Sequence, residues 1–249
     1  MLFRSDTTAC FYVQQPNYYG LFEDCEELGQ IVHEKGAKYI MGCNPIALGV
    51  MATPGQCGAD VATAEGQPLG MPLAYGGPYL GIMTCSEKMM RKIPGRIVGE
   101  TTDAEGNRAF VLTLQAREQH IRREKASSNI CSNQALCALT ASVYLAAMGP
   151  NGLRNVANLC LSKAHYAAQQ ISAIPGFEMV YQGEFFHEFV TSCPVCPQKV
   201  MQALEEKGIL GGLPLTGDKK GQILWCVTEM NTKEEIDTLV ETLKEVAGK

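Results

Sequence analysis

The chain of 249 residues is 46% hydrophobic and 19% charged, which is enough to bury a substantial core and suggests about two domains. Its net charge of -5 argues against the broad basic surface that nucleic acid or an anionic membrane would require. No uninterrupted apolar run of membrane-spanning length and no signal-peptide pattern are apparent. Eleven scattered cysteines, mostly within apolar runs, favour reduced core thiols, and we expect a cytoplasmic protein.

The first five residues, MLFRS, do not lead naturally into the strand predicted after them. A common sequencing adapter encodes LFRS in one reading frame. We therefore expect a truncated open reading frame and leave residues 1–5 out of the fold argument.

The first half of the chain predicts short buried strands alternating with helices or long connections. Strands are expected at residues 9–14, 38–41, 61–64, 80–85 and 109–114. Helices are expected at residues 21–34, ended by Gly36, and at residues 132–148. The polar stretch 92–107 and the charged stretch 115–128 are expected on the surface. This order predicts an α/β fold with a largely parallel sheet covered on both faces.

The clearest boundary is the sequence MGPNG at residues 148–152. It divides a sheet domain, residues 1–150, from a small α+β domain, residues 151–249. In the second part, Asn151 is expected to cap a long helix that ends at residue 174, and Thr232 to open the last helix with a capping box. The other expected elements are strands at 177–181, 188–191 and 223–227 and a helix at 197–207.

A loop rich in glycine and proline, residues 65–79, leaves one of the predicted strands. Functional loops of parallel sheets follow the carboxyl ends of strands, and Gln67 stands at the entrance of this one. Its glycines allow the backbone to approach a ligand closely. An ordinary connection between two buried strands explains the stretch equally well.

Self-contained catalytic motifs are missing from the sequence: there is no GxSxG, Walker loop, GxGxxG or HExxH. The four histidines lie far apart, and the pair Cys193 and Cys196 has no second pair at zinc spacing. We therefore expect no metal site. Cys196 precedes a predicted helix, where a lowered pKa and a redox role are conceivable, although ordinary packing is the simpler interpretation.

Ser127, Ser128 and Asn129 follow a run of basic residues and precede a predicted helix. Hydroxyl and backbone N–H groups at a helix N-terminus form a ready anion site. Simple N-capping of that helix by Ser128 or Asn129 is favoured on chemistry alone.

Five segments together resemble the P-protein family of the glycine cleavage system, and within it subunit 1 of the split bacterial form, the α subunit of glycine dehydrogenase (decarboxylating). They are QQPNYYGLFED (14–24), EGQPLG (65–70), GGPYLG (76–81), IPGRIVGETTD (93–103) and REQHIRREKASSN (117–129). The resemblance extends from Asp6 to the C-terminus. Members of the family are longer at the N-terminus, so it also implies truncation. It implies fold type I of the pyridoxal-phosphate (PLP) transferases, with part of a mostly parallel large domain with helices on both faces and a small C-terminal α+β domain.

The resemblance also implies a reaction and partners. In this family PLP supports the decarboxylation of glycine and the transfer of the aminomethyl group to the lipoyl arm of H protein. In the split form a second subunit, the catalytic β subunit, carries the PLP lysine.

Two departures from the catalytic pattern stand out. Aligning the loop prolines places Gln67 at the position of the PLP lysine, and the first strands place Gly42 at the position of the acid that faces the pyridine nitrogen. Neither residue can do the chemistry of the group it replaces. The resemblance therefore implies no catalytic residue on this chain, PLP on the partner subunit, and an inactive isolated chain. It also places Ser128 and Asn129 at the partner's PLP phosphate, across the subunit boundary.

Two alternatives remain open. One is an independent PLP enzyme of the same fold that uses another lysine, with Lys38 and Lys88 as candidates. The other is a binding module that recognises H protein or a ligand in a degenerate pocket around Glu65 and Gln67.

Overall fold

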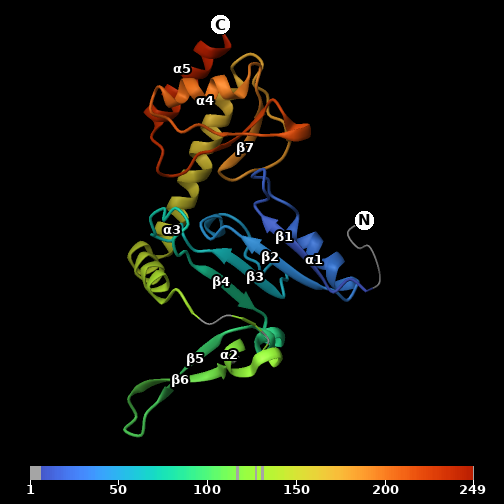
Figure 1. Cartoon of the computed structure of the whole chain (residues 1–249), viewed down its shortest axis with the longest axis vertical. Helices are drawn as coiled ribbons and strands as arrows, with labels where there is room; N and C mark the ends of the chain where they lie inside the picture. Colours follow the sequence, from blue (N-terminus) through green and yellow to red (C-terminus); the bar gives the residue numbers. More distant parts are fainter. Residues whose placement is uncertain (1–6, 116–117, 127, 130–131, 249) are drawn as a thin grey trace.

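The computed structural model describes residues 7–115, 118–126, 128–129 and 132–248. A four-stranded sheet with its helices forms the sheet unit, and a smaller C-terminal unit lies at the other end of a long helix (Figure 1). A two-stranded hairpin extends from the sheet unit on the side away from the C-terminal unit (Figure 1).

The sheet of the sheet unit is mixed. Its strands are β1 (Cys10–Gln15), β2 (Lys38–Cys43), β3 (Val61–Glu65) and β4 (Gly81–Cys85), in that spatial order. The first two pairings are parallel, and β4 runs antiparallel to β3. The four predicted strands are confirmed. The expectation of a largely parallel sheet holds for β1 to β3 and is wrong for β4, because the loop after β3 turns the chain straight back instead of crossing over.

Helix α1 (Cys25–Glu34) covers one face of this sheet. Val32 packs there against Tyr39 and Met41, which are fully buried. On the opposite face Tyr12 is 53% exposed and Met83 49% exposed. Within the described residues the prediction of helices on both faces is therefore correct for one face and wrong for the other.

Helix α1 begins later than predicted. The Asp24 side chain accepts a hydrogen bond from the Glu27 N–H at 2.9 Å and sets the start at Cys25. Leu21 and Phe22, which the apolar pattern assigned to the helix, pair instead with the backbone of Phe185 and Glu184 in the C-terminal unit. Gly36, with φ of 71°, follows the helix as predicted.

The hairpin consists of β5 (Arg96–Thr102) and β6 (Arg108–Gln115), paired antiparallel. Strand β6 was predicted, but the expectation of an irregular excursion across residues 92–107 is wrong for β5. The Asp103 side chain closes the turn by accepting hydrogen bonds from the N–H groups of Glu105 and Asn107. Short helices surround the hairpin: η2 (Glu87–Lys92), α2 (Gln119–Arg122) and η3 (Arg123–Lys125). Another short helix, η1 (Ala47–Gly49), follows β2.

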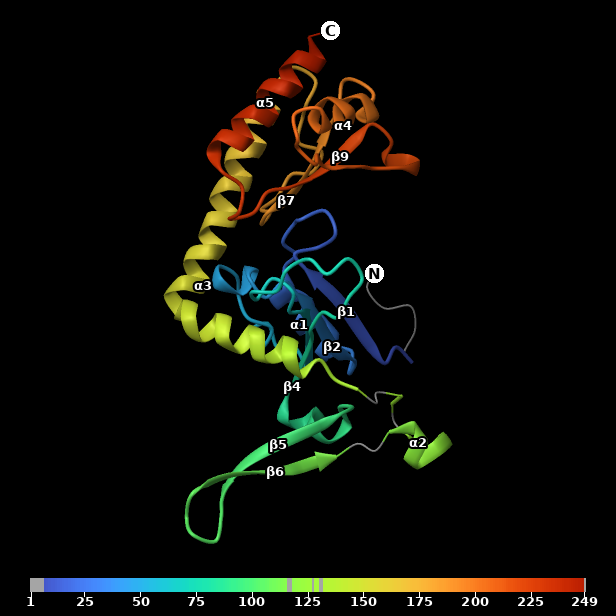
Figure 2. The same ribbon diagram turned by 60° about the vertical axis from the view of Figure 1, so that its left-hand side comes forward.

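Helix α3 (Ala135–Ser172) connects the two units (Figure 2). At Gly149 the backbone leaves helical geometry, with φ of 61° and ψ of -179°, and the helix changes direction. The expected end of a helix at residue 148 is confirmed by this break, whereas the cap at Asn151 is wrong, because helical geometry resumes directly after Gly149, before Asn151. Pro150 is tolerated because the first position after a break has no helical partner for an N–H.

By length and composition helix α3 is apolar enough to cross a membrane, which corrects the expectation that no segment is. Length and composition are weak evidence on their own, since core helices of water-soluble proteins meet the same criterion. Val156, Ala157 and Cys160 of this helix pack on the sheet unit, whereas Ala164 and Ile171 pack in the C-terminal unit.

The C-terminal unit has the strand order β7-β9-β8, all antiparallel, with β7 (Glu188–Ser192), β8 (Leu213–Pro214) and β9 (Gln222–Cys226). Helices α4 (Pro197–Glu205) and α5 (Lys233–Ala247) complete it. The prediction of a strand at residues 177–181 is wrong: the structure has there an isolated bridge between Met179 and Thr191. Strand β8 was not predicted. The capping box of Thr232 and Glu235 is confirmed. The domain division at residue 150 stays a prediction.

Candidate functional site

The loop entered by Gln67 has a fixed conformation. The exposed Glu65 carboxylate accepts hydrogen bonds from the N–H groups of Gln67 and Leu80, at 3.0 and 2.9 Å, which ties the two ends of the loop together. The Gln67 Nε2 donates to the backbone oxygen of Met71 at 2.7 Å. The half-buried amide therefore holds the loop closed from within.

The space above Gly42 is already filled. The Tyr12 hydroxyl donates to the Gln14 Oε1 at 2.7 Å, and both groups occupy the position that a Cβ on residue 42 would take. Any side chain at residue 42 would displace them. A carboxylate aimed at a ligand from this strand position would therefore need a rearranged sheet edge.

Two cavities meet at Gln67 and Pro68. The smaller, about 390 Å³, lies over Tyr12, Thr63 and Glu65. The larger, about 860 Å³, opens between the two units, and its lining includes Tyr144 and Met71 from the sheet side and His187, Cys226 and Glu229 from the C-terminal unit. This size is in the range that takes a small molecule.

The loop is anchored under helix α3. Leu69 is only 5% exposed and packs with Ala141 and Phe186. Gly70 has φ of 86°, and a Cβ there would come within 2.9 Å of the Tyr144 side chain. The left-handed backbone and this close approach both favour glycine at residue 70. Burial raises the pKa of Tyr144, so its phenol stays protonated at neutral pH.

These residues do not fit a covalently held PLP. No lysine is among the described residues that line either cavity, and the Gln67 amide is not a nucleophilic amine. Gly42 has no side chain and so offers no carboxylate for a pyridine nitrogen. The assignment of Gln67 to the lysine position and of Gly42 to the acid position stays a prediction.

The structure places Ser128 and Asn129 apart from both cavities, in the segment before helix α3. Ser128 is half-buried and Asn129 is exposed; Ser127 lies outside the described residues. Neither Ser128 nor Asn129 caps the helix, which corrects that interpretation: Gln134 is the N-cap, and the Asn133 side chain accepts from the Ala135 N–H at 3.1 Å. The predicted contact with a phosphate stays untested.

The cysteine pair Cys193 and Cys196 and the candidate lysines Lys38 and Lys88 lie in surroundings that do not indicate catalysis. Burial raises the pKa of Cys193, the opposite of what a reactive thiol requires, and the exposed Cys196 contacts Gln198 at 3.1 Å. Lys38 forms an ion pair with the buried Asp60 at 2.8 Å, and Lys88 lies exposed in η2. Neither lysine is among the described residues that line the two cavities at Gln67.

Sequence reasoning missed one cluster on the C-terminal unit. His187, Glu188 and Cys226 lie side by side, although histidine and cysteine spacing gave no signal. Only the pairing register of β7 with β9 brings them together, since it sets Glu188 opposite Cys226. Burial lowers the pKa of His187 to about 4, so its imidazole is neutral.

The overall architecture is that of the PLP-dependent transferases. A solved NifS-like protein from Rickettsia africae aligns with a TM-score of 0.68 over 97% of this chain and 62% of its own, at 13% identity. At that identity the likeness shows the fold alone.

Sequence comparison narrows this class. Residues 2–243 match the family described as glycine cleavage system P-protein, and the chain belongs to that family. A crystal structure of glycine decarboxylase (P-protein) of the glycine cleavage system, in inhibitor-bound form, aligns with a TM-score of 0.90 and 41% identity, covering 97% of this chain and 55% of that one.

Curated relatives of similar sequence have names that agree with this family. A protein of Desulfitobacterium hafniense is 50% identical over 96% of this chain and 54% of its own length, and one of Desulforamulus reducens is 52% identical over 95% and 54%. Both are described as probable glycine dehydrogenase (decarboxylating) subunit 1. The chain thus spans about half the length of the curated relatives it matches.

Proposed function

We propose that this chain works as a non-catalytic subunit of a glycine dehydrogenase (decarboxylating), paired with a catalytic subunit that holds PLP. In that complex glycine would be decarboxylated and its aminomethyl group passed to lipoylated H protein. The names of the relatives and the structural match support this role.

One observation carries the non-catalytic part of the proposal. The Gln67 amide is bonded inside its own loop, and the Tyr12 hydroxyl fills the space over Gly42. The loop thus keeps a defined conformation without the amine and the carboxylate that PLP chemistry uses. A loop with a defined conformation but no reactive groups is consistent with a subunit that contributes by binding the catalytic subunit.

The test is to reduce the complex of this chain, the catalytic subunit and PLP with borohydride and to map the labelled peptide. We expect the pyridoxyl label on the catalytic subunit only, and exchange between the glycine carboxyl group and bicarbonate only when both chains and H protein are present. Label on Lys38 or Lys88 of this chain would instead favour the independent enzyme. Binding of H protein without the catalytic subunit would favour the binding module.

Ser128 and Asn129 give a second, narrower test of the pairing. The segment that holds them lies beside the exposed basic residues Arg122, Arg123 and Lys125, and we propose that it reaches the partner's PLP phosphate. Replacing both Ser128 and Asn129 by Ala should weaken PLP retention by the complex about tenfold, the effect of about 1.4 kcal/mol. The matched control is Ser142→Ala, whose hydroxyl is bonded within helix α3. Equal PLP retention by the double variant and the control contradicts the contact.

We propose a cytoplasmic location for the complex.

A further inference from the structure

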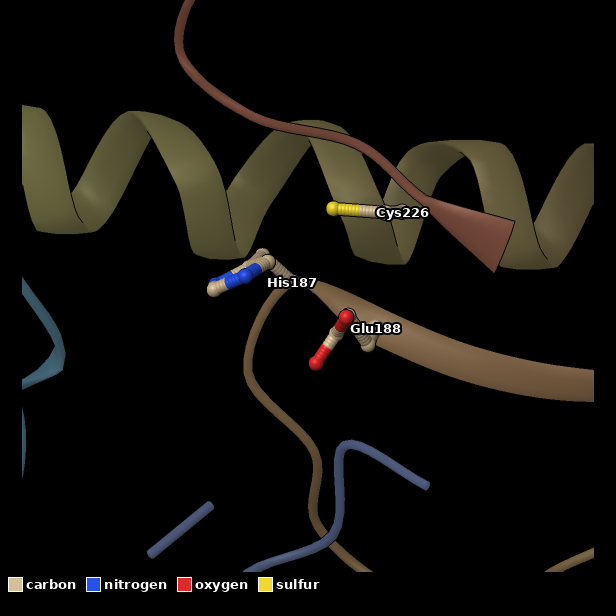
Figure 3. A group of neighbouring side chains, drawn as sticks. All are labelled: His187, Glu188 and Cys226. Atoms are coloured by element: carbon tan, nitrogen blue, oxygen red, sulfur yellow. The ribbon is translucent and has the colours of Figure 1, made fainter. Parts of the chain in front are cut away.

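Three side chains with metal-binding atoms meet where β7 begins and β9 ends. One ligand atom from each of His187, Glu188 and Cys226 lies within 4.8 Å of the other two. Figure 3 shows the Cys226 sulfur, the His187 ring and the Glu188 carboxylate gathered beside helix α3. They form what we call the His–Glu–Cys cluster.

The backbone fixes this cluster. Glu188 and Cys226 are partners in the antiparallel ladder, and the Val227 N–H donates to the His187 oxygen at 2.9 Å. Partners in such a ladder project their side chains from the same face of the sheet. His187 precedes the first residue of the strand, so its side chain is not held to the strict alternation of the ladder and can lie beside the other two.

The chemical surroundings of the cluster favour a cation. The His187 Nδ1 is buried, and no hydrogen-bond partner is found for it in the part of the chain that the structure covers. A buried polar atom without a partner is costly. The carboxylates of Glu188 and Glu229 lie close enough to the Cys226 thiol to interact with it electrostatically, so negative charge is available here to balance a cation.

We propose that His187, Glu188 and Cys226 bind a divalent transition metal ion of the zinc type. Imidazole nitrogen, carboxylate oxygen and thiolate sulfur are the donors that zinc combines, whereas magnesium and calcium select oxygen donors. Ligand bonds of about 2.0–2.3 Å in a tetrahedron place donor atoms roughly 3.5 Å apart. Side-chain rotations that move the ligand atoms by about an ångström would therefore bring all three to bonding distance of the ion, and the Cys226 thiol would release its proton to solvent.

Three protein ligands leave one position open, as in zinc sites that bind water or a small ligand. His187 and Cys226 line the cavity of about 860 Å³, so that position has access to its interior. Around the cluster, the Cys160 thiol contacts the Glu229 Oε2 at 3.2 Å, and the Lys163 ammonium is bonded to the backbone oxygens of Glu229 and Asn231. The Lys163 ammonium is therefore hydrogen-bonded to backbone carbonyl groups. The metal site involves no property of PLP and stands independently of the proposed function.

The experiment titrates the chelator-treated full chain with Zn²⁺ and, separately, with Co²⁺. We expect one Zn²⁺ per chain by calorimetry, no displacement by millimolar Mg²⁺, and a near-ultraviolet charge-transfer band with Co²⁺, because a thiolate–cobalt bond absorbs there. The variants His187→Ala, Glu188→Gln and Cys226→Ser should each weaken Zn²⁺ binding at least tenfold. Cys226→Ser should also lose the cobalt band.

Matched controls separate this site from adventitious binding. Cys196→Ser removes another exposed thiol of the C-terminal unit, and His120→Asn removes an exposed imidazole far along the chain. Both should bind Zn²⁺ like the unmodified chain. The proposal is overturned if the folded chain binds no stoichiometric Zn²⁺, if it gives no thiolate band with Co²⁺, or if Cys196→Ser and Cys226→Ser weaken binding equally. Should Cys226→Ser unfold, the cobalt band of the unmodified chain and a rise of its Tm with Zn²⁺ still decide the matter.

Discussion

The two units of the molecule bury their apolar residues differently. In the C-terminal unit, Phe177, Phe189, Ile223 and Leu243 are at most 1% exposed, packed between the three-stranded sheet and helices α3 to α5. The sheet unit buries Val13, Tyr39 and Met41 on the face covered by helix α1 and leaves large apolar side chains such as Tyr12 and Met83 exposed on the other. The first part of helix α3 adds more, with Leu136 at 76% and Leu139 at 60% exposure. Contiguous exposed apolar surface is typical of contact with further protein. The C-terminal unit therefore has a closed apolar core, whereas the sheet unit and the first part of helix α3 offer apolar surface for contact with further protein.

The largest effect should come from the same substitution made in both regions. Phe189→Ala in the C-terminal core should lower the free energy of unfolding by about 3–5 kcal/mol, because it leaves a cavity. Phe110→Ala, at 62% exposure on the hairpin, should change it by no more than about 0.5 kcal/mol. Urea unfolding measures both. Equal losses would mean that the two regions do not differ as described.

A buried charge tests the covered face of the sheet unit. Burial alone would raise the pKa of Asp60, but hydrogen bonds from the Lys38 ammonium, the Tyr39 N–H and the His33 ring outweigh it and hold that pKa below its usual value. Asp60→Asn should cost about 1–3 kcal/mol at pH 7.

The pH dependence of this cost has a definite sign. Because the folded pKa is lowered, the stabilisation is present above the unfolded pKa of about 4 and is lost as the pH falls through the lower, folded pKa. The stability difference between the unmodified chain and Asp60→Asn should therefore shrink as the pH is lowered from 5 to 3, measured by urea unfolding. A constant difference would show that the carboxylate charge is not what matters.

Gly42 probes the uncovered face of the same sheet. Gly42→Ala should cost about 1–3 kcal/mol, because its Cβ overlaps the Tyr12 hydroxyl and the Gln14 side chain. Gly81→Ala in strand β4 is the control, since its Cβ would enter open space. Adding Tyr12→Ala to Gly42→Ala should recover much of the loss in thermal unfolding. No recovery would argue against the steric cause.

The smallest predicted effect concerns helix α5. Thr232→Ala removes a hydroxyl that accepts from the Glu235 N–H at 3.2 Å, and the loss should be about 1 kcal/mol. Thr232→Ser keeps the hydroxyl and should leave Tm nearly unchanged. A full loss in the serine variant would assign the effect to packing of the methyl group instead of the cap.

Local patterns predicted most of the elements, because their signals lie within a few residues. The apolar runs of β1 to β4, Gly36 after helix α1 and the Thr232 capping box are examples. Strand β5 was missed because its sequence RIVGETT does not alternate between apolar and polar residues, and its pairing depends on β6. The direction of β4 depends on tertiary packing, which a local pattern does not contain, whereas the break at Gly149 falls within the predicted boundary at residues 148–152.

The candidate site divides in the same way. Gln67 and Gly42 were singled out by aligning long motifs, and their assignment to the lysine and acid positions stays a prediction. The hydrogen bond inside the Gln67 loop and the filled space over Gly42 are visible only in the structure. The His–Glu–Cys cluster had no counterpart in the sequence, because its members are joined only by the register of two strands that are distant along the chain. The segment at Ser128 was located, but the surface that it is proposed to meet belongs to another chain.

The bend at Gly149 has a geometric consequence for the exposed arm of helix α3. With φ of 61° and ψ of -179°, this residue occupies a region that is open essentially to glycine alone. Fourteen helical residues precede it, an arm of roughly 21 Å, so one degree of rotation at this joint displaces the tip by about 0.4 Å. The direction in which the exposed Leu136 and Leu139 side chains point therefore depends on the backbone torsion of one glycine that lies outside this apolar surface.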